Sequence, residues 1–423
     1  MVIGQGSENH FLSSERIEEI CAQAFENKRI DGKRLLFVIP DYTRTAPLDV
    51  LFRTLLRLLA GRVRKMDFLV ALGTHPPMSE EQILRRVGSS LAEKEADFPQ
   101  IHFFNHEWQN PEKLVRIGSI SAEEVEEISG GRMNQSVEVA INRLVLEYDL
   151  LVIIGPTFPH EVVGFSGGNK YLIPGIAGAD IIDMFHWLGA LITSPVIIGN
   201  KRTPVREIVD RAAALIPIER FCLSLVVKEN GLVGLFAGPP EEAWSAAADL
   251  STKLYIIFKE QPYQRVLACA PDMYDDLWTG AKCMYKLEPV VADGGELIIY
   301  APHIQQVSIT HGADIEAIGY HVRDYYLKQM DKFRHVRGGV MAHSTHVKGV
   351  GSYIDGVEKP RINVVLATQI SAATCAKINL GYCDPRAIHL QEWQNRENDG
   401  RLYVPKAGEM LYRLRVDPFK QAI

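Results

Sequence analysis

Residues 150–170 read LLVIIGPTFPHEVVGFSGGNK, a seven-residue apolar run followed at once by a polar, glycine-rich segment. The run LLVIIGP (150–156) is short, continuous and partly β-branched, which is typical of a strand buried inside a parallel sheet. In such sheets, ligands bind beyond the carboxyl ends of the strands. The order of the two segments therefore predicts a ligand site directly after residue 156.

The same order recurs along the chain. Further buried strands are predicted at RLLFVIP (34–40), MDFLVALG (66–73), RVLACAP (265–271) and ELIIYAP (296–302). Helices are predicted at 179–188, 206–216 and 240–254. Two more are predicted to begin after Thr45, with Pro47 in the first turn, and after the capping residue Ser79. This alternation predicts an α/β protein with mostly parallel sheets flanked by helices. Because the pattern restarts near residue 260, we expect two domains, 1–258 and 259–423.

The composition is that of an ordinary globular protein. Hydrophobic residues make up 47% and charged residues 23% of the 423 residues, which argues against disorder. The formal net charge of −6 gives no basic surplus of the kind that nucleic-acid-binding proteins show. We see neither a membrane-spanning run nor a signal peptide. The six cysteines are scattered, which predicts reduced thiols and a cytoplasmic location and argues against a cysteine zinc site.

Two polar clusters follow the strands predicted at 34–40 and 66–73. The first, Asp41-Tyr42-Thr43-Arg44, opens a helix, so its backbone N–H groups and its guanidinium group suit an anion. A capped turn with a surface arginine is the simpler alternative. The second cluster places His75 ahead of two prolines that stiffen the loop. Because histidine titrates near neutral pH, His75 is a candidate acid–base residue.

The segment that starts at His160 is the most informative. Three glycines around Ser166 allow positive φ angles and a close approach of the backbone to a ligand. Their spacing matches neither a P-loop nor a dinucleotide-binding motif. Lys170 follows the turn as a candidate nucleophile or covalent anchor. His186, on the predicted helix 179–188, carries an imidazole, a common ligand of zinc, copper, nickel or iron.

The second half contains a further cluster and several histidines. Trp278 offers a flat apolar face, and Lys282 follows one helical turn later. Four histidines lie in segments expected to be loops: His303, His311, His343 and His346. Their spacing is not that of a zinc site. We interpret them as part of a polar pocket for a hydroxylated substrate.

In the order and spacing of these motifs, the chain resembles the nickel-pincer lactate racemase family. The motifs are D-x-T-R at 41–44, G-x-H at 73–75, H-x3-G-F-S-G-G-x-K at 160–170, P-G-I-A-G at 174–178 and His186. A further motif, W-x3-K at 278–282, stands where the family's prototype has Y-Q-x-x-K. The resemblance covers nearly the whole chain, and the block 160–186 is its most specific part.

The resemblance implies a cofactor and a role for each matching residue. Residues 1–258 would bind a nickel-pincer nucleotide (pyridinium-3-thioamide-5-thiocarboxylic acid mononucleotide), and 259–423 would complete the substrate pocket, with the active site in the cleft between them. Lys170 would be bonded to the cofactor, His186 would bind nickel, and His75 and His160 would be the acid–base pair. The other implied cofactor contacts are Asp41, Thr43, Arg44, Gly167, Gly168 and Trp278, and the implied substrate contacts are Arg44, Lys282, Thr279 and His303.

The implied activity is inversion of C2 of a 2-hydroxy acid by reversible hydride transfer. One histidine takes the hydroxyl proton, hydride leaves C2, and its return to the other face of the keto acid gives the opposite configuration. Two bases serve the two enantiomers. The implied partners are a small 2-hydroxy acid and the proteins that build the cofactor, with neither nucleic acid nor a membrane.

The chain also departs from the family pattern. Tyr42 replaces a histidine, Asn169 replaces an arginine, and Trp278 and Thr279 replace a tyrosine and a glutamine. Because Thr279 is shorter than glutamine, we expect a larger, polyhydroxylated substrate such as an aldonate, which would make the protein a 2-epimerase. Three alternatives stay open: racemisation of lactate or malate, a non-catalytic nucleotide or sugar-acid binding protein, and a pyridoxal phosphate enzyme with a Schiff base at Lys170.

Overall fold

The computed structural model describes residues 1–26 and 28–419. Two compact units are present. The first comprises Met1–Phe158, Phe165–Ile182 and Arg206–Leu254, and the second comprises Pro159–Gly164, Asp183–Val205 and Tyr255–Ile423. This division differs from the predicted one, because the units change at residue 254 and two earlier segments belong to the second unit. Strand–helix alternation cannot indicate such excursions, since long-range packing determines them.

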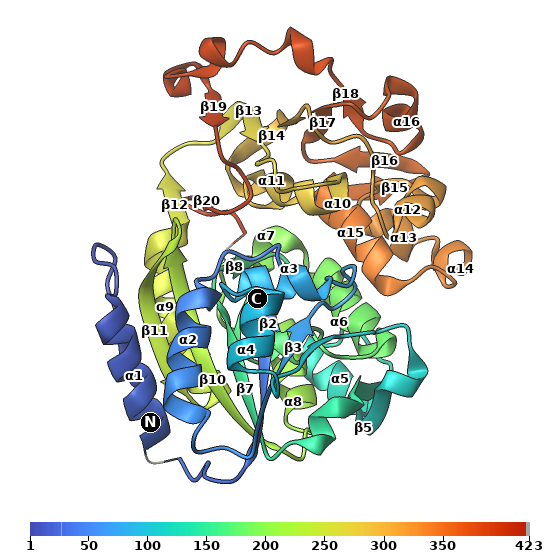
Figure 1. Ribbon diagram of the computed structural model, residues 1–423. Helices are drawn as coiled ribbons and strands as arrows, with labels where there is room; N and C mark the ends of the chain where they lie inside the picture. The colour runs from blue at the N-terminus through green and yellow to red at the C-terminus, as the bar shows by residue number, and fades with distance from the viewer. Residues whose placement is uncertain (27, 420–423) are drawn as a thin grey trace. The chain divides into compact units, whose positions relative to one another are not determined.

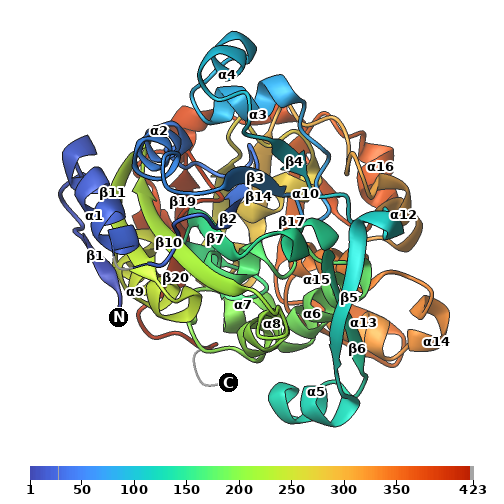
Figure 2. The same ribbon diagram turned by 60° about the horizontal axis from the view of Figure 1, so that its bottom comes forward.

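The first unit is built on a seven-stranded sheet in the order β1-β11-β10-β7-β2-β3-β4 (Figures 1 and 2). The strands from β10 to β4 run parallel, and β11 is antiparallel to both of its neighbours. The strands are β1 (Ile3–Gly6), β2 (Arg34–Pro40), β3 (Lys65–Ala71), β4 (Phe103–Asn105), β7 (Leu150–Pro156), β10 (Glu219–Lys228) and β11 (Gly231–Gly238). The predicted strands 34–40 and 150–156 are thus confirmed.

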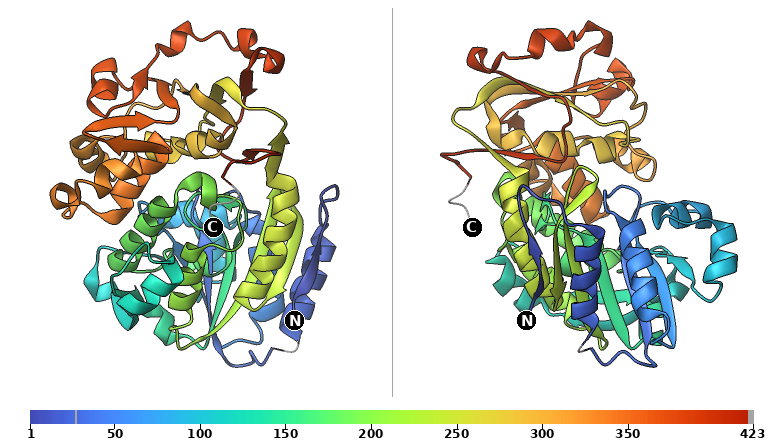
Figure 3. Two further views of the ribbon diagram at one scale, coloured as in Figure 1. Left: turned by 180° about the vertical axis from the view of Figure 1, so that it is seen from behind. Right: turned by 60° about the vertical axis from the view of Figure 1, so that its left-hand side comes forward.

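Helices cover both faces of this sheet. Alternate residues of β2, Leu35 and Phe37, pack in one core with Phe25 of α1 (Ser14–Glu26) and Leu55 of α2 (Leu48–Leu59). The helices α8 (Pro204–Ala213) and α9 (Pro240–Tyr255) lie on the opposite face, where α9 stands in front of the sheet in the left view of Figure 3. Because successive side chains of a strand point to opposite faces of the sheet, each face forms its own apolar layer against its helices, as the α/β prediction requires.

The start of α2 differs from the prediction in one detail. Pro47 has a ψ of 65°, which is not helical, so it precedes the helix instead of lying in its first turn. Ser79 caps α3 with a reciprocal capping box, as expected. The other elements up to α8 are α3 (Glu80–Arg86), α4 (Leu91–Asp97), η1 (Pro111–Lys113), β5 (Leu114–Ile120), α5 (Ala122–Ser129), β6 (Val137–Asn142), η2 (Arg143–Glu147), β8 (Pro159–His160), β9 (Gly164–Phe165), η3 (Gly168–Tyr171), α6 (Ala179–Ile192) and α7 (Ser194–Ile197).

The second unit contains a five-stranded parallel sheet in the order β18-β17-β14-β13-β19. Its strands are β13 (Tyr263–Cys269), β14 (Val291–Ala301), β17 (Asn363–Thr368), β18 (Gly381–Tyr382) and β19 (Arg401–Val404). Val266 and Ala268 of β13 face the helical side of the sheet, whereas Leu267 and Cys269 pack with Trp393 on the other side. Figure 3 shows this sheet from two sides, with helices of residues 310–348 in orange.

The remaining elements of this unit correct one expectation. His343 and His346 do not lie in a loop but are buried on helix α15 (Gly338–Lys348). Tertiary packing overrides the weak helix propensity of this Gly- and Thr-containing segment. The other elements are β12 (Ile256–Lys259), α10 (Leu277–Gly280), α11 (Lys282–Tyr285), η4 (Glu288–Val290), α12 (Gly312–Ile318), α13 (Arg323–Leu327), α14 (Met330–Phe333), β15 (Gly351–Ile354), β16 (Val357–Pro360), α16 (Ala372–Lys377), η5 (Pro385–Ala387), η6 (Leu390–Trp393), η7 (Glu397–Asp399) and β20 (Leu411–Leu414).

The described residues also test two general expectations. No helix formed by these residues has the length and apolar character needed to cross a membrane. All six cysteines are free thiols, and five of these are buried. The cytoplasmic location stays a prediction.

Candidate active site

A histidine–carboxylate dyad stands beyond the carboxyl ends of two neighbouring parallel strands of the first unit. Asp41 follows β2 and His75 follows β3, and the His75 Nδ1 atom lies 2.5 Å from Asp41 Oδ2. The other carboxylate oxygen accepts the Thr43 hydroxyl at 2.6 Å and its backbone N–H at 2.9 Å. Since Asp41 holds a proton on Nδ1, Nε2 is the ring nitrogen of His75 that can exchange a proton with a substrate.

Positive charges keep the buried carboxylate of this dyad ionised. Burial alone would raise the pKa of Asp41, but His75, Arg44 and the Thr43 hydroxyl outweigh it and hold that pKa well below its ordinary value. The Arg44 guanidinium contacts Thr43 Oγ1 at 3.0 Å and lies 5.7 Å from the Phe158 ring centroid. Tyr171 of η3 is buried within range of the same charges. The cluster therefore joins β2, β3 and η3.

Buried side chains that the sequence analysis did not identify hold the glycine-rich turn in place. Gly167 and Gly168 have φ angles of 85° and 58°, and a Cβ atom on Gly168 would lie 2.8 Å from Trp244 Cβ. Trp244 Nε1 donates to the Ser166 carbonyl at 2.8 Å. Arg206 donates to the Phe165 carbonyl at 2.5 Å and lies 4.1 Å over the Trp244 ring. Only glycine fits two consecutive positions of this packed turn.

Asn169 joins the turn to a network of charged side chains. Its side-chain amide donates to Asp210 at 2.9 Å and to Glu241 at 2.7 Å, and its oxygen accepts from Arg220 at 2.8 Å. Burial raises the pKa of Asp210, whereas in Glu241 the contacts with Asn169 and Arg220 outweigh burial and lower the pKa. The next residue, half-buried Lys170, donates its backbone N–H to the Gly167 carbonyl. The position of the lysine is therefore built into the turn.

His160, in the second unit, has the opposite hydrogen-bonding pattern to His75. Its Nδ1 atom accepts the Val162 backbone N–H at 3.2 Å, which leaves the ring proton on Nε2. Glu161 Oε2 lies 3.3 Å from the same Nδ1, a contact that would suit only a protonated ring. We assign the neutral form because the backbone donor is fixed in position. Lys286, buried nearby, donates to the Pro159 carbonyl at 2.5 Å.

The second unit gathers four histidines around two helices. His186 lies half-buried on α6 and acts electrostatically on His343 and His346 of α15. Asp183 of α6 receives two hydrogen bonds from Arg337, at 3.0 and 3.1 Å, and one from the Gly339 backbone N–H. The bidentate pair therefore ties α6 to the start of α15.

Burial favours the uncharged form of three histidines of this cluster. It lowers the pKa of His343 well below the ordinary value and the pKa of His346 to about 3, and together with Arg337 it lowers the pKa of His311. Trp278 stacks on His343 at 3.9 Å and lies 4.5 Å from His311. Neutral imidazoles are metal ligands and hydrogen-bonding groups. Within residues 1–26 and 28–419, however, no three His, Cys, Asp or Glu side chains are arranged to hold a metal ion.

The other predicted residues of the second unit form two small groups. The Thr279 hydroxyl bonds to Asp276, the N-cap of α10, at 2.9 Å, so it is engaged in the cap. Lys282 lies 4.6 Å from the Tyr274 ring, and His303 Nε2 contacts the Tyr274 carbonyl at 3.1 Å. The structure thus brings Lys282 and His303 to one tyrosine and Trp278 to the buried histidines.

Comparison with known proteins identifies relatives of known activity. The family model "Lactate racemase N-terminal domain" matches residues 13–196. A lactate racemase from Thermoanaerobacterium thermosaccharolyticum is 28% identical over 304 residues, which cover 67% of this chain and 65% of the relative. A lactate racemase from Lactiplantibacillus plantarum is 28% identical over 249 residues, which cover 57% of this chain and 52% of the relative. The alignments thus span less than two thirds of each curated relative.

Solved structures extend the similarity over the whole chain. A protein from Thermotoga maritima is 32% identical with a TM-score of 0.88, covering 97% of this chain and 100% of its own. The lactate racemase apoprotein from T. thermosaccharolyticum has a TM-score of 0.70 at 19% identity, covering 98% of this chain and 100% of its own, which shows a shared fold. The chain therefore belongs to the lactate racemase family.

Proposed function

We propose that this protein is a nickel-dependent racemase or epimerase that inverts C2 of a 2-hydroxy acid by reversible hydride transfer. The observation that carries the proposal is the 2.5 Å contact between Asp41 and His75 beyond the carboxyl ends of β2 and β3, in a chain of the lactate racemase family. The dyad is a built acid–base group, which simple binding of an anion does not require.

The two proposed acid–base residues are held by opposite hydrogen bonds. His75 Nδ1 contacts the Asp41 carboxylate, whereas His160 Nδ1 accepts the Val162 N–H, so in each ring Nε2 is the atom proposed to exchange a proton. Inversion needs one ring that accepts the hydroxyl proton of the first enantiomer and another that returns a proton to the second. Each ring is thus prepared for its task by hydrogen bonds inside its own unit.

The residues proposed for the cofactor fit a group that brings most of its own metal ligands. Among the described residues, His186 belongs to no protein cluster able to hold a metal ion, yet it is surrounded by neutral imidazoles. A nickel-pincer nucleotide would supply sulfur and carbon ligands and a hydride acceptor. Lys170 would hold it covalently, with Gly167 and Gly168 letting the backbone approach it. Trp278 would offer its ring as an apolar contact.

The dyad changes the role proposed for two other residues. Both Asp41 oxygens are engaged, one with His75 and one with Thr43. Asp41 and Thr43 therefore orient the base, and Arg44 remains the residue of this turn for an anionic phosphate or carboxylate. Lys282 is the corresponding cation of the second unit. Each of the two cations would form charge-assisted hydrogen bonds with an anionic group.

We further propose a polyhydroxylated sugar acid, such as an aldonate, as the substrate. The partly exposed His303, which lies with Lys282 at Tyr274, supports this choice because its ring can bond a substrate hydroxyl. Thr279 is also shorter than the glutamine of the family pattern. Lactate or malate is the alternative, and a site built to bind several hydroxyl groups would disfavour such a smaller acid.

The test uses protein produced together with the cofactor-building proteins. A panel of 2-hydroxy acids is screened for loss of stereochemical purity and for exchange of label at C2. We expect inversion with about one nickel per chain, and loss of inversion with retained nickel in His75→Ala and His160→Ala. Full turnover in both variants would remove the two-base mechanism. Binding of an acid without exchange at C2 in nickel-loaded protein would favour a non-catalytic binding protein.

A further inference from the structure

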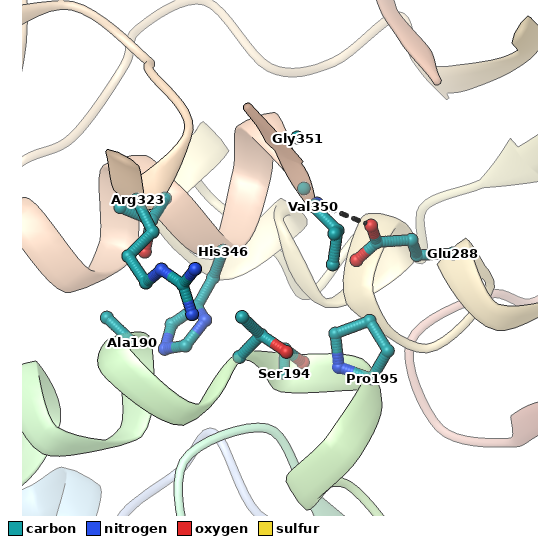
Figure 4. A pocket seen from close by; sticks show the side chains of 11 residues that line it. Ala190, Ser194, Pro195, Glu288, Arg323, His346, Val350 and Gly351 are labelled. Atoms are coloured by element: carbon teal, nitrogen blue, oxygen red, sulfur yellow. Dashed lines mark hydrogen bonds between the residues drawn. The ribbon is translucent and has the colours of Figure 1, made fainter. Parts of the chain in front are cut away.

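The second unit contains a small cavity that the proposed mechanism does not use (Figure 4). Its volume is about 30 Å³. Ser194 and Pro195 of α7 form one side, and Glu288 of η4 and His346 of α15 converge on it from two others, as Figure 4 shows. Three elements that are distant in sequence therefore meet at one cavity.

Three polar atoms in the cavity wall have no hydrogen-bond partner among the described residues. They are Ser194 Oγ, Glu288 Oε2 and His346 Nε2. These residues are 2%, 0% and 5% exposed, so bulk water does not reach them. Buried polar atoms are nearly always paired, and an unpaired one destabilises the fold. Three such atoms at one cavity indicate a small hydrogen-bonding ligand.

Size and charge restrict the ligand to a small neutral molecule. Because a buried water needs about 10–15 Å³, the cavity has room for about two. The cavity wall offers a carboxyl oxygen, an imidazole nitrogen and a hydroxyl group, a set that can both donate to and accept from one small molecule. A metal cation would need several oxygen ligands and would face Arg361, which lies 4.0 Å from Glu288 Oε1.

We propose that this cavity is a water-binding site in which water bridges Glu288, Ser194 and His346. The water pairs with Glu288 Oε2, His346 Nε2 and Ser194 Oγ, the three buried atoms that have no partner among the described residues. Three partners are what a buried water typically has. The other Glu288 oxygen accepts the Val350 backbone N–H at 2.7 Å, which holds the carboxyl group toward the cavity.

The site is tested first in nickel-free protein by thermal unfolding. If water bonds Ser194, then Ser194→Ala loses a hydrogen bond, and the Tm falls by about 2–4 °C, as expected for a folding unit of 150–250 residues. Ser251→Ala is the matched control, because the Ser251 hydroxyl is also buried and unpartnered but does not line the cavity. Removing an unsatisfied hydroxyl should leave the Tm unchanged or raise it. Glu288→Gln keeps both polar atoms and should retain the Tm, whereas Glu288→Leu should lower it.

The outcomes decide whether the cavity holds water. A Tm for Ser194→Ala equal to or above that of the wild type would mean a dry cavity and overturn the proposal, as would an empty cavity in a high-resolution crystal structure. A Tm that rises with added K⁺ or Mg²⁺ in the wild type but not in Glu288→Gln would show that a cation occupies the site instead of water and would also overturn the proposal. Because every variant is measured without nickel, none of these outcomes depends on the proposed function.

Discussion

Replacing Arg206 by methionine tests how the turn before Lys170 is held. The Arg206 guanidinium is buried, donates to the Phe165 carbonyl at 2.5 Å and to the Gly167 carbonyl at 3.4 Å, and lies 4.1 Å over the Trp244 ring. Methionine has a similar length but no donor and no charge. Two carbonyl groups of the turn would therefore lose a buried donor at the same time.

The magnitude follows from these contacts. A hydrogen bond to a charged group contributes about 1.5–3 kcal/mol, and a desolvated cation–π contact about 2 kcal/mol. The bond of 3.4 Å is near the geometric limit and adds little. Against these losses, methionine needs no desolvation of a charge. We expect Arg206→Met to lower the free energy of unfolding by about 2–4 kcal/mol. Arg206→Lys should lower it by about half as much, because lysine keeps the charge but not the planar fork.

The assay combines urea denaturation with labelling of lysines by an amine-reactive reagent, read by peptide mass spectrometry. Lys170 is half-buried in the wild type and should be labelled faster once the turn is loosened. Arg202→Met is the control, because this exposed arginine lies in the same segment and its loss should change stability by less than about 0.5 kcal/mol. The reasoning is refuted if Arg206→Met unfolds like the wild type and Lys170 keeps its labelling rate.

Three further outcomes are expected. Gly168→Ala should lower the free energy of unfolding by about 2–4 kcal/mol in urea, because alanine at a φ of 58° is strained and its Cβ would lie 2.8 Å from Trp244 Cβ; an unchanged midpoint would contradict this. Asp41→Asn should slow stereoinversion by about 10²–10⁴-fold at unchanged nickel content, since it removes the charge that orients His75, and near-normal turnover would exclude that role. Stability should also fall as the pH drops from about 6.5 to 4. Burial lowers the pKa of His106 to about 4, so the unfolded chain binds a proton in this window that the native state does not. With about 1.4 kcal/mol per pH unit the loss approaches 3 kcal/mol, and His106→Gln, measured by urea denaturation at each pH, should flatten this part of the profile.

The strands and their order along the chain could be predicted because they depend on local sequence. LLVIIGP and RLLFVIP are continuous apolar runs, and β7 and β2 begin and end where these runs do. The placement of Asp41 and His75 followed from the same logic, since the carboxyl ends of adjacent parallel strands meet at one sheet edge. Ser79 could be predicted as a cap because its partner Gln82 is only three residues away.

The support of the site could not be predicted in this way. Arg206 and Trp244 lie on α8 and α9, 36 and 74 residues after Lys170, and nothing in their own segments marks them as partners of the turn. His343 and His346 were misplaced in a loop because α15 owes its helical form to packing. In the sequence, the only signal at position 206 is an arginine among apolar residues. Many surface helices carry the same pattern, so it does not identify a buried arginine.

Residue 169 shows how the chain departs from the family pattern without losing the turn. The family has an arginine before the anchoring lysine, whereas this chain has Asn169, which is 1% exposed. Its amide bonds two carboxylates, Asp210 and Glu241, and its oxygen accepts from Arg220. With Arg206 nearby, two guanidinium groups already balance two carboxylates, so an arginine at 169 would add an unbalanced buried charge. The asparagine is therefore a consistent part of a different charge arrangement beside Lys170.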